Sequence, residues 1–169
     1  MVTAHGEHFP SQESWEGRDL GDGVLRYLRG PGGNPQLADG IEYYAKYFVG
    51  SINFPLSKLH RVVSGEPEEA GYYDPQWQEN VAAIRQKIES GWIPPPLIVV
   101  DYLSGRLDIA DGNHTSQALE DCGITSHPTI FCLESNRSEQ DLLDYQTPSE
   151  YQPSIKTMVD AVKNRKQKK

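Results

Sequence analysis

The fold is decided by the stretch Asp108-Ile109-Ala110-Asp111-Gly112-Asn113-His114-Thr115-Ser116-Gln117-Ala118-Leu119. Its pattern is that of the end of a strand, a turn with one glycine, and the first turns of a helix. A strand that enters a helix through glycine leaves backbone N–H groups at the helix start without intrahelical partners. Such groups attract phosphate and other anions. The sequence therefore predicts an anion-binding turn at this point.

The turn carries polar side chains that fit such a site. His114, in the first helical turn, can donate a hydrogen bond to a phosphate oxygen, or it can be a structural residue that caps the turn. Asp111 can act as a general base or hold a metal ion, or it can accept hydrogen bonds from the backbone of the turn. Gly112 allows either a positive φ or the close approach of a ligand to the backbone. Asn113, Thr115 and Ser116 add side-chain donors, so we expect the phosphate-binding residues to be Gly112 to Ser116.

The neighbouring segments predict an α/β fold with a small mixed sheet flanked by helices. Leu97 to Val100 is a buried strand by its branched residues, and Ser104-Gly105 returns the chain as a partner strand over Arg106 to Ala110. The helix after the turn ends at Gly123, and His127 to Leu133 is the next strand. We expect the two hairpin carboxylates, Asp101 and Asp108, to face solvent.

Upstream, three segments have a clear period. Asp74 to Glu89 is a helix that begins with an N-cap and a proline, and Trp77, Val81, Ile84 and Ile88 form its apolar stripe. Ser51 to Leu59 is a strand with a proline near its end, as expected of an edge. Asp39 to Val49 has helical spacing, with Gly50 as its end. His60 to Tyr73 is expected to be a long loop.

Charge and composition limit the classes of protein to which this chain can belong. The chain has 169 residues and a net charge of −8, which suits a globular domain. The segment Lys156–Lys169 has six basic residues and one acidic residue, so the rest of the chain carries a net charge of −13. Such an acidic body repels nucleic acid, which is therefore possible as a partner but disfavoured. No long apolar run and no leader pattern is visible, so we expect no membrane association and a cytoplasmic location. Oligomeric state is not readable.

The order of these elements resembles the ParB/sulfiredoxin superfamily over about residues 51 to 133. The pieces that carry the resemblance are Pro55-Leu56-Ser57-Lys58-Leu59, Asp74-Pro75, Ala83-Ile84-Arg85, Pro94-Pro95-Pro96-Leu97-Ile98-Val99, Asp111-Gly112-Asn113-His114, Ala118-Leu119 and Gly123-Ile124-Thr125-Ser126-His127-Pro128. The resemblance implies a core at 51–135, with an N-terminal extension at 1–50 that contains one helix and a C-terminal helical segment at 136–169 that ends in a basic tail.

The resemblance also implies a ligand. Members of this superfamily bind a nucleoside triphosphate at the start of the helix, so the expected partner is a nucleotide or another phosphorylated small molecule. The implied cofactor is Mg²⁺ with ATP or CTP, with Asp111 as the metal-binding residue. Asp111 and His114 are the catalytic candidates if the chain is an enzyme that transfers a phosphoryl group or hydrolyses the nucleotide.

Departures from the family pattern narrow these expectations. Sulfiredoxins carry a catalytic Cys where this chain has Asn113, and an amide has no thiolate, so sulfiredoxin activity is not expected. Most members have Arg where Thr115 stands and a hydroxyl residue where Ala83 stands. A cation from elsewhere would have to replace that Arg, and motif order makes Arg85, Lys58 and Arg61 the candidates. Two other hypotheses remain open, a nuclease that cleaves a phosphodiester and a non-catalytic ligand-binding or regulatory module.

Overall fold

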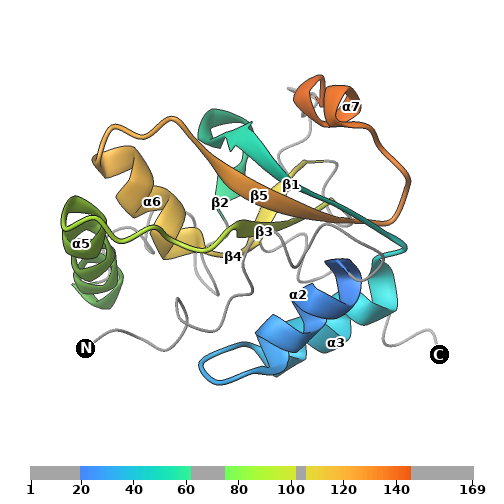
Figure 1. Ribbon diagram of the computed structural model, residues 1–169, viewed down its shortest axis with the longest axis horizontal. Helices are drawn as coiled ribbons and strands as arrows, with labels where there is room; N and C mark the ends of the chain where they lie inside the picture. Colours follow the sequence, from blue (N-terminus) through green and yellow to red (C-terminus); the bar gives the residue numbers. More distant parts are fainter. Residues whose placement is uncertain (1–19, 62–74, 102–105, 146–169) are drawn as a thin grey trace.

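The structure, a computed structural model, describes residues 20–61, 75–101 and 106–145. Its helices lie around one sheet (Figure 1). They are α2 (Leu20–Arg29), α3 (Pro35–Tyr44), β1 (Tyr47–Pro55), the single 3₁₀ turn η2 (Leu56–Lys58), β2 (His60–Arg61), α5 (Pro75–Glu89), β3 (Leu97–Val100), β4 (Asp108–Asp111), α6 (Asn113–Asp121), β5 (Ser126–Leu133) and α7 (Glu139–Leu143).

The sheet has five strands in the order β1-β5-β3-β4-β2. It is mixed, because β1–β5 and β3–β4 are antiparallel whereas β5–β3 and β4–β2 are parallel. The predicted hairpin of β3 and β4 is confirmed, and so is the edge position of the strand that ends at Pro55. The α/β fold class predicted from the sequence is therefore correct.

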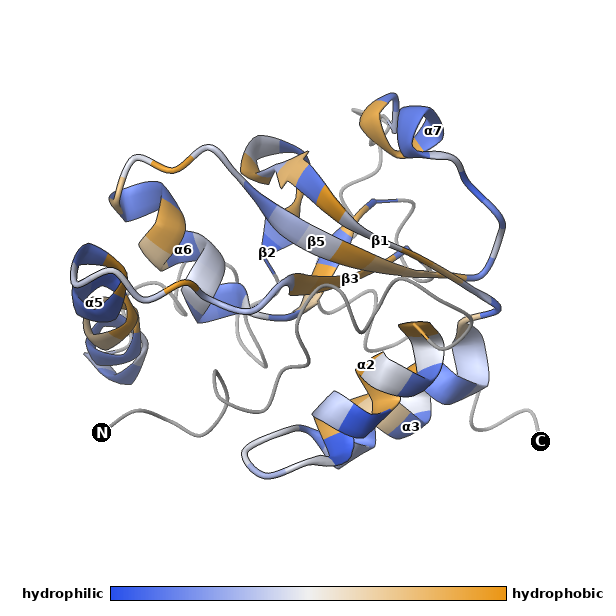
Figure 2. Ribbon diagram, in the orientation of Figure 1, coloured by the Kyte–Doolittle hydropathy of each residue, from blue (hydrophilic) through white to orange (hydrophobic). Residues whose placement is uncertain are grey.

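Helices cover both faces of this sheet. On one face α2 and α3 pack with Ile98, Val100 and Ile130, and on the other face Leu119 of α6 and Leu142 of α7 pack with the remaining strand residues. Figure 2 shows β3 to be apolar and β2 to be polar, while α5 carries apolar residues on one side and polar residues on the other. The apolar area buried in these two layers is the main term that stabilises the fold.

Helix α5 forms an outer layer against α6. Trp77 and Val81 of α5 form a buried cluster with Ala118 of α6. The predicted apolar stripe of α5 is thus its contact face, with Ile84 and Ile88 partly buried beside the same cluster. Trp77, near the start of α5, contacts His114 at the start of α6, and Arg85, further along α5, lines a groove with Asp121 at the end of α6.

The helix predicted over Asp39 to Val49 is only partly correct. Asn34 caps α3 by accepting a hydrogen bond from the N–H of Leu37, so the helix begins earlier, at Pro35. It ends at Tyr44, and the following residues enter β1, where Phe48 pairs with Cys132 of β5. Aromatic and β-branched residues favour a pleated surface, and pairing with β5 prevails over the helical spacing.

Two further expectations need correction. The described part of the N-terminal extension, residues 20–50, contains two helices, α2 and α3, where one was expected, and both contribute to the core. His60 and Arg61, expected in a loop, form the short edge strand β2. At the other end, Ser138-Glu139-Gln140-Asp141 has the sequence pattern of a capping box, and the structure confirms it, because the Ser138 hydroxyl accepts from the N–H of Asp141 and the Asp141 carboxylate accepts from the N–H of Ser138. Residues 62–74, and residues 146–169 of the expected C-terminal helical segment, lie outside the described residues.

The two hairpin carboxylates are buried, contrary to the sequence expectation. The Asp108 and Arg106 side chains are 7% and 5% exposed, and Arg106 Nε lies 3.0 Å from Asp108 Oδ1. His60 Nδ1 lies 3.2 Å from the same oxygen. The Asp101 side chain is 5% exposed, accepts a hydrogen bond from the N–H of Glu134, and pairs with Arg137. Burial of these charges is tolerated because each one has a partner.

We predict that Asp108→Ala lowers the free energy of unfolding by about 3–5 kcal/mol, because it leaves the Arg106 charge buried without its carboxylate. Urea denaturation of the two proteins measures the change. Asp39→Ala is the matched control, since it removes an exposed carboxylate from Arg29 and should change stability little. Equal effects of the two substitutions would show that the buried pair is not important for stability.

Candidate functional site

The turn between β4 and α6 is shaped by an irregularity in the sheet. Val99 pairs with Ile109, but Ile98 pairs with Asp111, so β4 has one extra residue opposite β3. An extra residue of this kind re-aims the side chains that follow it. Asp111 therefore shares the face of Ile98, which is the face covered by α2 and α3.

Gly112 is required at the start of α6 for two reasons. Its φ is +100°, a left-handed conformation that L side chains rarely adopt. A Cβ at this position would lie 2.5 Å from Cδ2 of Leu97, which is fully buried. Gly112 also provides no side-chain cap, so the first N–H groups of α6 are not capped by the residue that precedes them.

Two polar side chains of the turn bind backbone carbonyls. Asn113 Nδ2 donates to the carbonyl of Ile109 at 3.0 Å, and Ser116 Oγ donates to the carbonyl of Asn113 at 2.8 Å. The N–H of Ser116 donates to the carbonyl of Gly112, which closes the first helical turn. These contacts hold the turn in one conformation and account for the roles of Asn113 and Ser116 in the structure.

His114 lies on the α5 side of the turn. Its ring centroid is 4.1 Å from that of Trp77, and the planes are tilted by 38°. Burial lowers the pKa of His114 below its ordinary value, because a charged imidazole would lose solvation there. His114 is thus neutral near pH 7 and can donate one hydrogen bond from its ring.

Asp111 lies toward a different part of the molecule. The pKa of the Tyr27 hydroxyl in α2 is raised, first by burial and second by the negative charge of Asp111. The sheet register puts Asp111 on the face that α2 and α3 cover, whereas His114 contacts α5. Within the described ranges no group of three or more His, Cys, Asp or Glu side chains could hold a metal ion. Thr115, the remaining predicted ligand, is half-buried in the first turn of α6.

Of the three candidate cations, Arg61 contacts the first turn of α6. Its Nε donates to Ser116 Oγ at 2.9 Å, and its other nitrogens bind Gln117 and Glu120 on the same side of the helix. Lys58 instead donates to the carbonyl of Leu143 in α7. Arg85 pairs with Glu89 on the outer surface of α5 at 2.9 Å. The structure therefore does not bring Lys58 and Arg85 to the turn.

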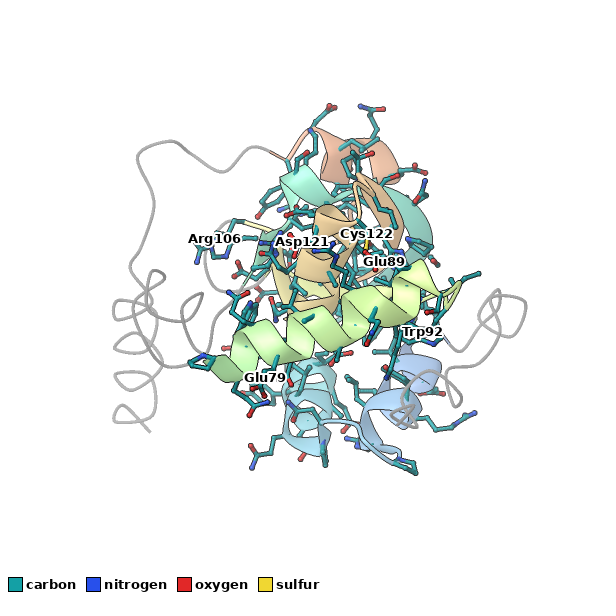
Figure 3. The ribbon with its side chains drawn as sticks, turned by 90° about the vertical axis from the view of Figure 1, so that its left-hand side faces the viewer. Glu79, Glu89, Trp92, Arg106, Asp121 and Cys122 are labelled. Carbon is teal, nitrogen blue, oxygen red and sulfur yellow. The ribbon has the colours of Figure 1, made fainter. Side chains whose placement is uncertain are left out.

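Arg85 lines a groove between α5 and the far end of α6. The groove has a volume of about 580 Å³, and Glu79, Glu89 and Asp121 also line it. Figure 3 views the molecule from the α5 side, with Glu79 toward one end of α5 and Glu89 near Asp121 and Cys122 toward the other. Because three of these four charged residues are acidic, the groove does not attract a phosphate group.

Comparisons with known proteins find solved structures that are similar to this one. No family model matches the sequence, and no curated protein is similar to it. A sulfiredoxin from Arabidopsis thaliana aligns with 16% identity and a TM-score of 0.33, over 59% of this chain and 96% of the sulfiredoxin. The chromosome-partitioning protein ParB from Caulobacter crescentus, complexed with CTP-gamma-S, aligns with 17% identity and a TM-score of 0.32, over 57% of this chain and 49% of the ParB chain.

A sulfiredoxin and a ParB protein are thus among the solved structures to which this chain is similar. The chain spans about half the length of the ParB structure. In a separate finding, none of the helices in the described part of the chain is long and apolar enough to cross a membrane.

We predict that Gly112→Ala destabilises the protein more than Gly123→Ala does. Gly123 has a φ of +77° with open space around its Cβ position, so its substitution costs the backbone strain alone, about 1–2 kcal/mol. Gly112→Ala combines a φ of +100°, which is further from the left-handed minimum, with the clash with Leu97. Thermal and urea unfolding of both variants measure the difference. If both substitutions cost the same, the close approach to Leu97 is not a constraint on the turn.

We predict that the stability difference between the wild type and His114→Gln decreases on acidification. The folded pKa of His114 lies below its unfolded value of about 6.5, so protonation favours the unfolded chain. The stabilisation by the neutral ring is therefore full above about pH 6.5 and is lost as the pH falls through the folded pKa. Urea unfolding at pH 7.5, 6 and 5 measures it, and a difference that does not change with pH would contradict the prediction.

Proposed function

We propose that the turn from Gly112 to Ser116 binds a phosphate group of a nucleotide or of another phosphorylated small molecule. The observation that carries the proposal is the start of α6, where Gly112 has a φ of +100° and provides no side-chain cap. The first N–H groups of an α-helix have no carbonyl acceptor within the helix. The helix dipole adds a partial positive charge at the same point.

The charges around the turn support an anion as ligand. The Arg61 guanidinium lies against the first turn, and neutral His114 has a ring N–H to donate. Asp111 directly precedes the turn in the sequence, and its negative charge opposes a phosphate. Mg²⁺ binds proteins through one or two carboxylates together with phosphate oxygens, so a single carboxylate at Asp111 fits a metal that arrives with a nucleotide. Such an ion would screen the phosphate charge.

The arrangement supports binding more than it supports catalysis. Phosphoryl transfer or nucleotide hydrolysis by Asp111 and His114 would need both groups at one reacting phosphate. Asp111 lies on the face of the sheet that α2 and α3 cover, and His114 contacts Trp77 of α5. The amide of Asn113 and the hydroxyl of Ser116 are engaged with backbone carbonyls. We therefore propose a ligand-binding module, with turnover as a separate outcome of the experiment.

The proposal is tested by melting the protein with millimolar ATP, CTP, GTP or pyrophosphate, each with and without Mg²⁺. A ligand at 100 times its Kd stabilises the folded state by about 2.7 kcal/mol, which raises Tm by several degrees. No shift with any of these ligands would overturn the proposal. Released phosphate and nicked plasmid, measured in the same samples, would reveal nucleotide hydrolysis or a nuclease, and neither product is expected.

Thr115→Arg provides a gain-of-function version of this test. An Arg in the first turn of α6 offers two charged donors to a phosphate, so we expect Kd to fall about tenfold or more. Thr125→Arg is the matched control, because it makes the same change of composition and charge at an exposed position beyond the other end of α6. Equal effects of the two variants would show that the phosphate does not bind at the turn.

A further inference from the structure

Arg61 is the side chain near the turn that the proposed ligand-binding role does not fully explain. It comes from the two-residue strand β2, and its side chain is only 15% exposed. Its backbone pairs with Ile109 of β4 in the sheet. From that position the guanidinium reaches across to α6, where Nε is 2.9 Å from Ser116 Oγ.

The contacts of Arg61 begin a chain of hydrogen bonds that leads from β2 through the first turn of α6 to β4. The Arg61 guanidinium donates to Ser116, and Ser116 donates to the carbonyl of Asn113. Asn113 donates through its side chain to the carbonyl of Ile109. Ile109 is the register partner of Arg61 in the parallel pair of β2 and β4, so this chain of hydrogen bonds links the Arg61 side chain to the neighbouring strand β4. It joins both sides of the turn without a contact from the ligand.

The position of the charge is unusual for a helix. A cation beside the amino-terminal turn opposes the helix dipole, and an acid in the last turn opposes it as well. Here Arg61 lies on the first turn, and Glu120 lies one residue before the end of α6 at Asp121. The ion pair between Arg61 and Glu120 compensates both charges along one side of the helix. An anion at the turn would find this guanidinium already in place.

We propose that Arg61 is a positioning residue for anion binding at the turn. Its guanidinium ties the first turn of α6 to the β2–β4 pair, and Glu120 holds that guanidinium on the helix. The role rests on the proposed function, because it presumes a phosphate ligand at Gly112 to Ser116. The proposal for Arg61 adds that the affinity for the phosphate ligand depends on a residue that need not contact the ligand.

The first test measures the turn itself, without ligand, by amide hydrogen exchange. Arg61→Ala should accelerate exchange at the N–H of Ser116, which closes the first turn on Gly112. The N–H of Ser90, bonded to Gln86 in α5, is the internal control and should not change. Unchanged exchange at Ser116 in a folded variant would overturn the proposal whether or not a nucleotide binds.

The second test measures the Kd of ATP with Mg²⁺. Arg61→Ala should weaken binding about tenfold, and Arg61→Lys should restore part of the loss because it keeps the charge but not the fork. Arg85→Ala is the matched control, since it removes an exposed Arg paired with Glu89 on α5, and it should leave Kd unchanged. Equal Kd values for Arg61→Ala and the wild type would overturn the proposal.

Glu120→Gln keeps an acceptor for the guanidinium and removes the compensating charge. We expect it to tighten ATP binding several-fold more than Asp121→Asn, which makes the same charge change at a neighbouring residue bonded to Gln117. Equal changes in Kd for Glu120→Gln and Asp121→Asn would overturn the role assigned to Glu120. A wild type that binds no nucleotide would instead refute the proposed function, and the exchange experiment would still decide whether Arg61 holds the first turn of α6.

Discussion

The close approach of Gly112 to Leu97 is the constraint on which the site and the surrounding layers depend. With no Cβ at residue 112, α6 can begin directly against β3, and the left-handed φ turns the chain from the sheet into the helix. Leu119 of α6 then reaches the core on that face of the sheet. Ala118 presents the other side of α6 to Trp77 of α5. The positions of α6 and α5 therefore both follow from one glycine.

The shortest strand of the sheet, β2, organises the polar groups around this joint. Its two residues point into two different networks, because successive residues of a strand face opposite sides. His60 lies beside the buried pair of Asp108 and Arg106, while Arg61 crosses to α6. A strand of two residues contributes little apolar burial, so its importance lies in these contacts. They connect the edge of the sheet to the start of the helix.

Local signals in the sequence predicted the elements whose ends are set by neighbouring residues. Pro75 and the stripe of Trp77 and Val81 predicted α5, and the capping residues around Ser138 predicted α7. The boundary between α3 and β1 could not be obtained in this way. The spacing of Ile41 and Phe48 fits a helix, but pairing of Phe48 with β5 is a contact between residues far apart in the chain. Tertiary pairing overrides local periodicity in such cases.

The sequence by itself determined the mixed α/β class, the hairpin, and the turn at Gly112 as the candidate site, because strand, glycine and helix signals are local. The tertiary structure decided which charges reach that turn. Arg61, Lys58 and Arg85 were equivalent candidates along the chain, and the pairing of β2 with β4 brings Arg61 to Ser116. It also decided that Asp108 is buried and that Asp111 and His114 lie toward different helices. These outcomes depend on packing between distant segments, which no short stretch of sequence encodes.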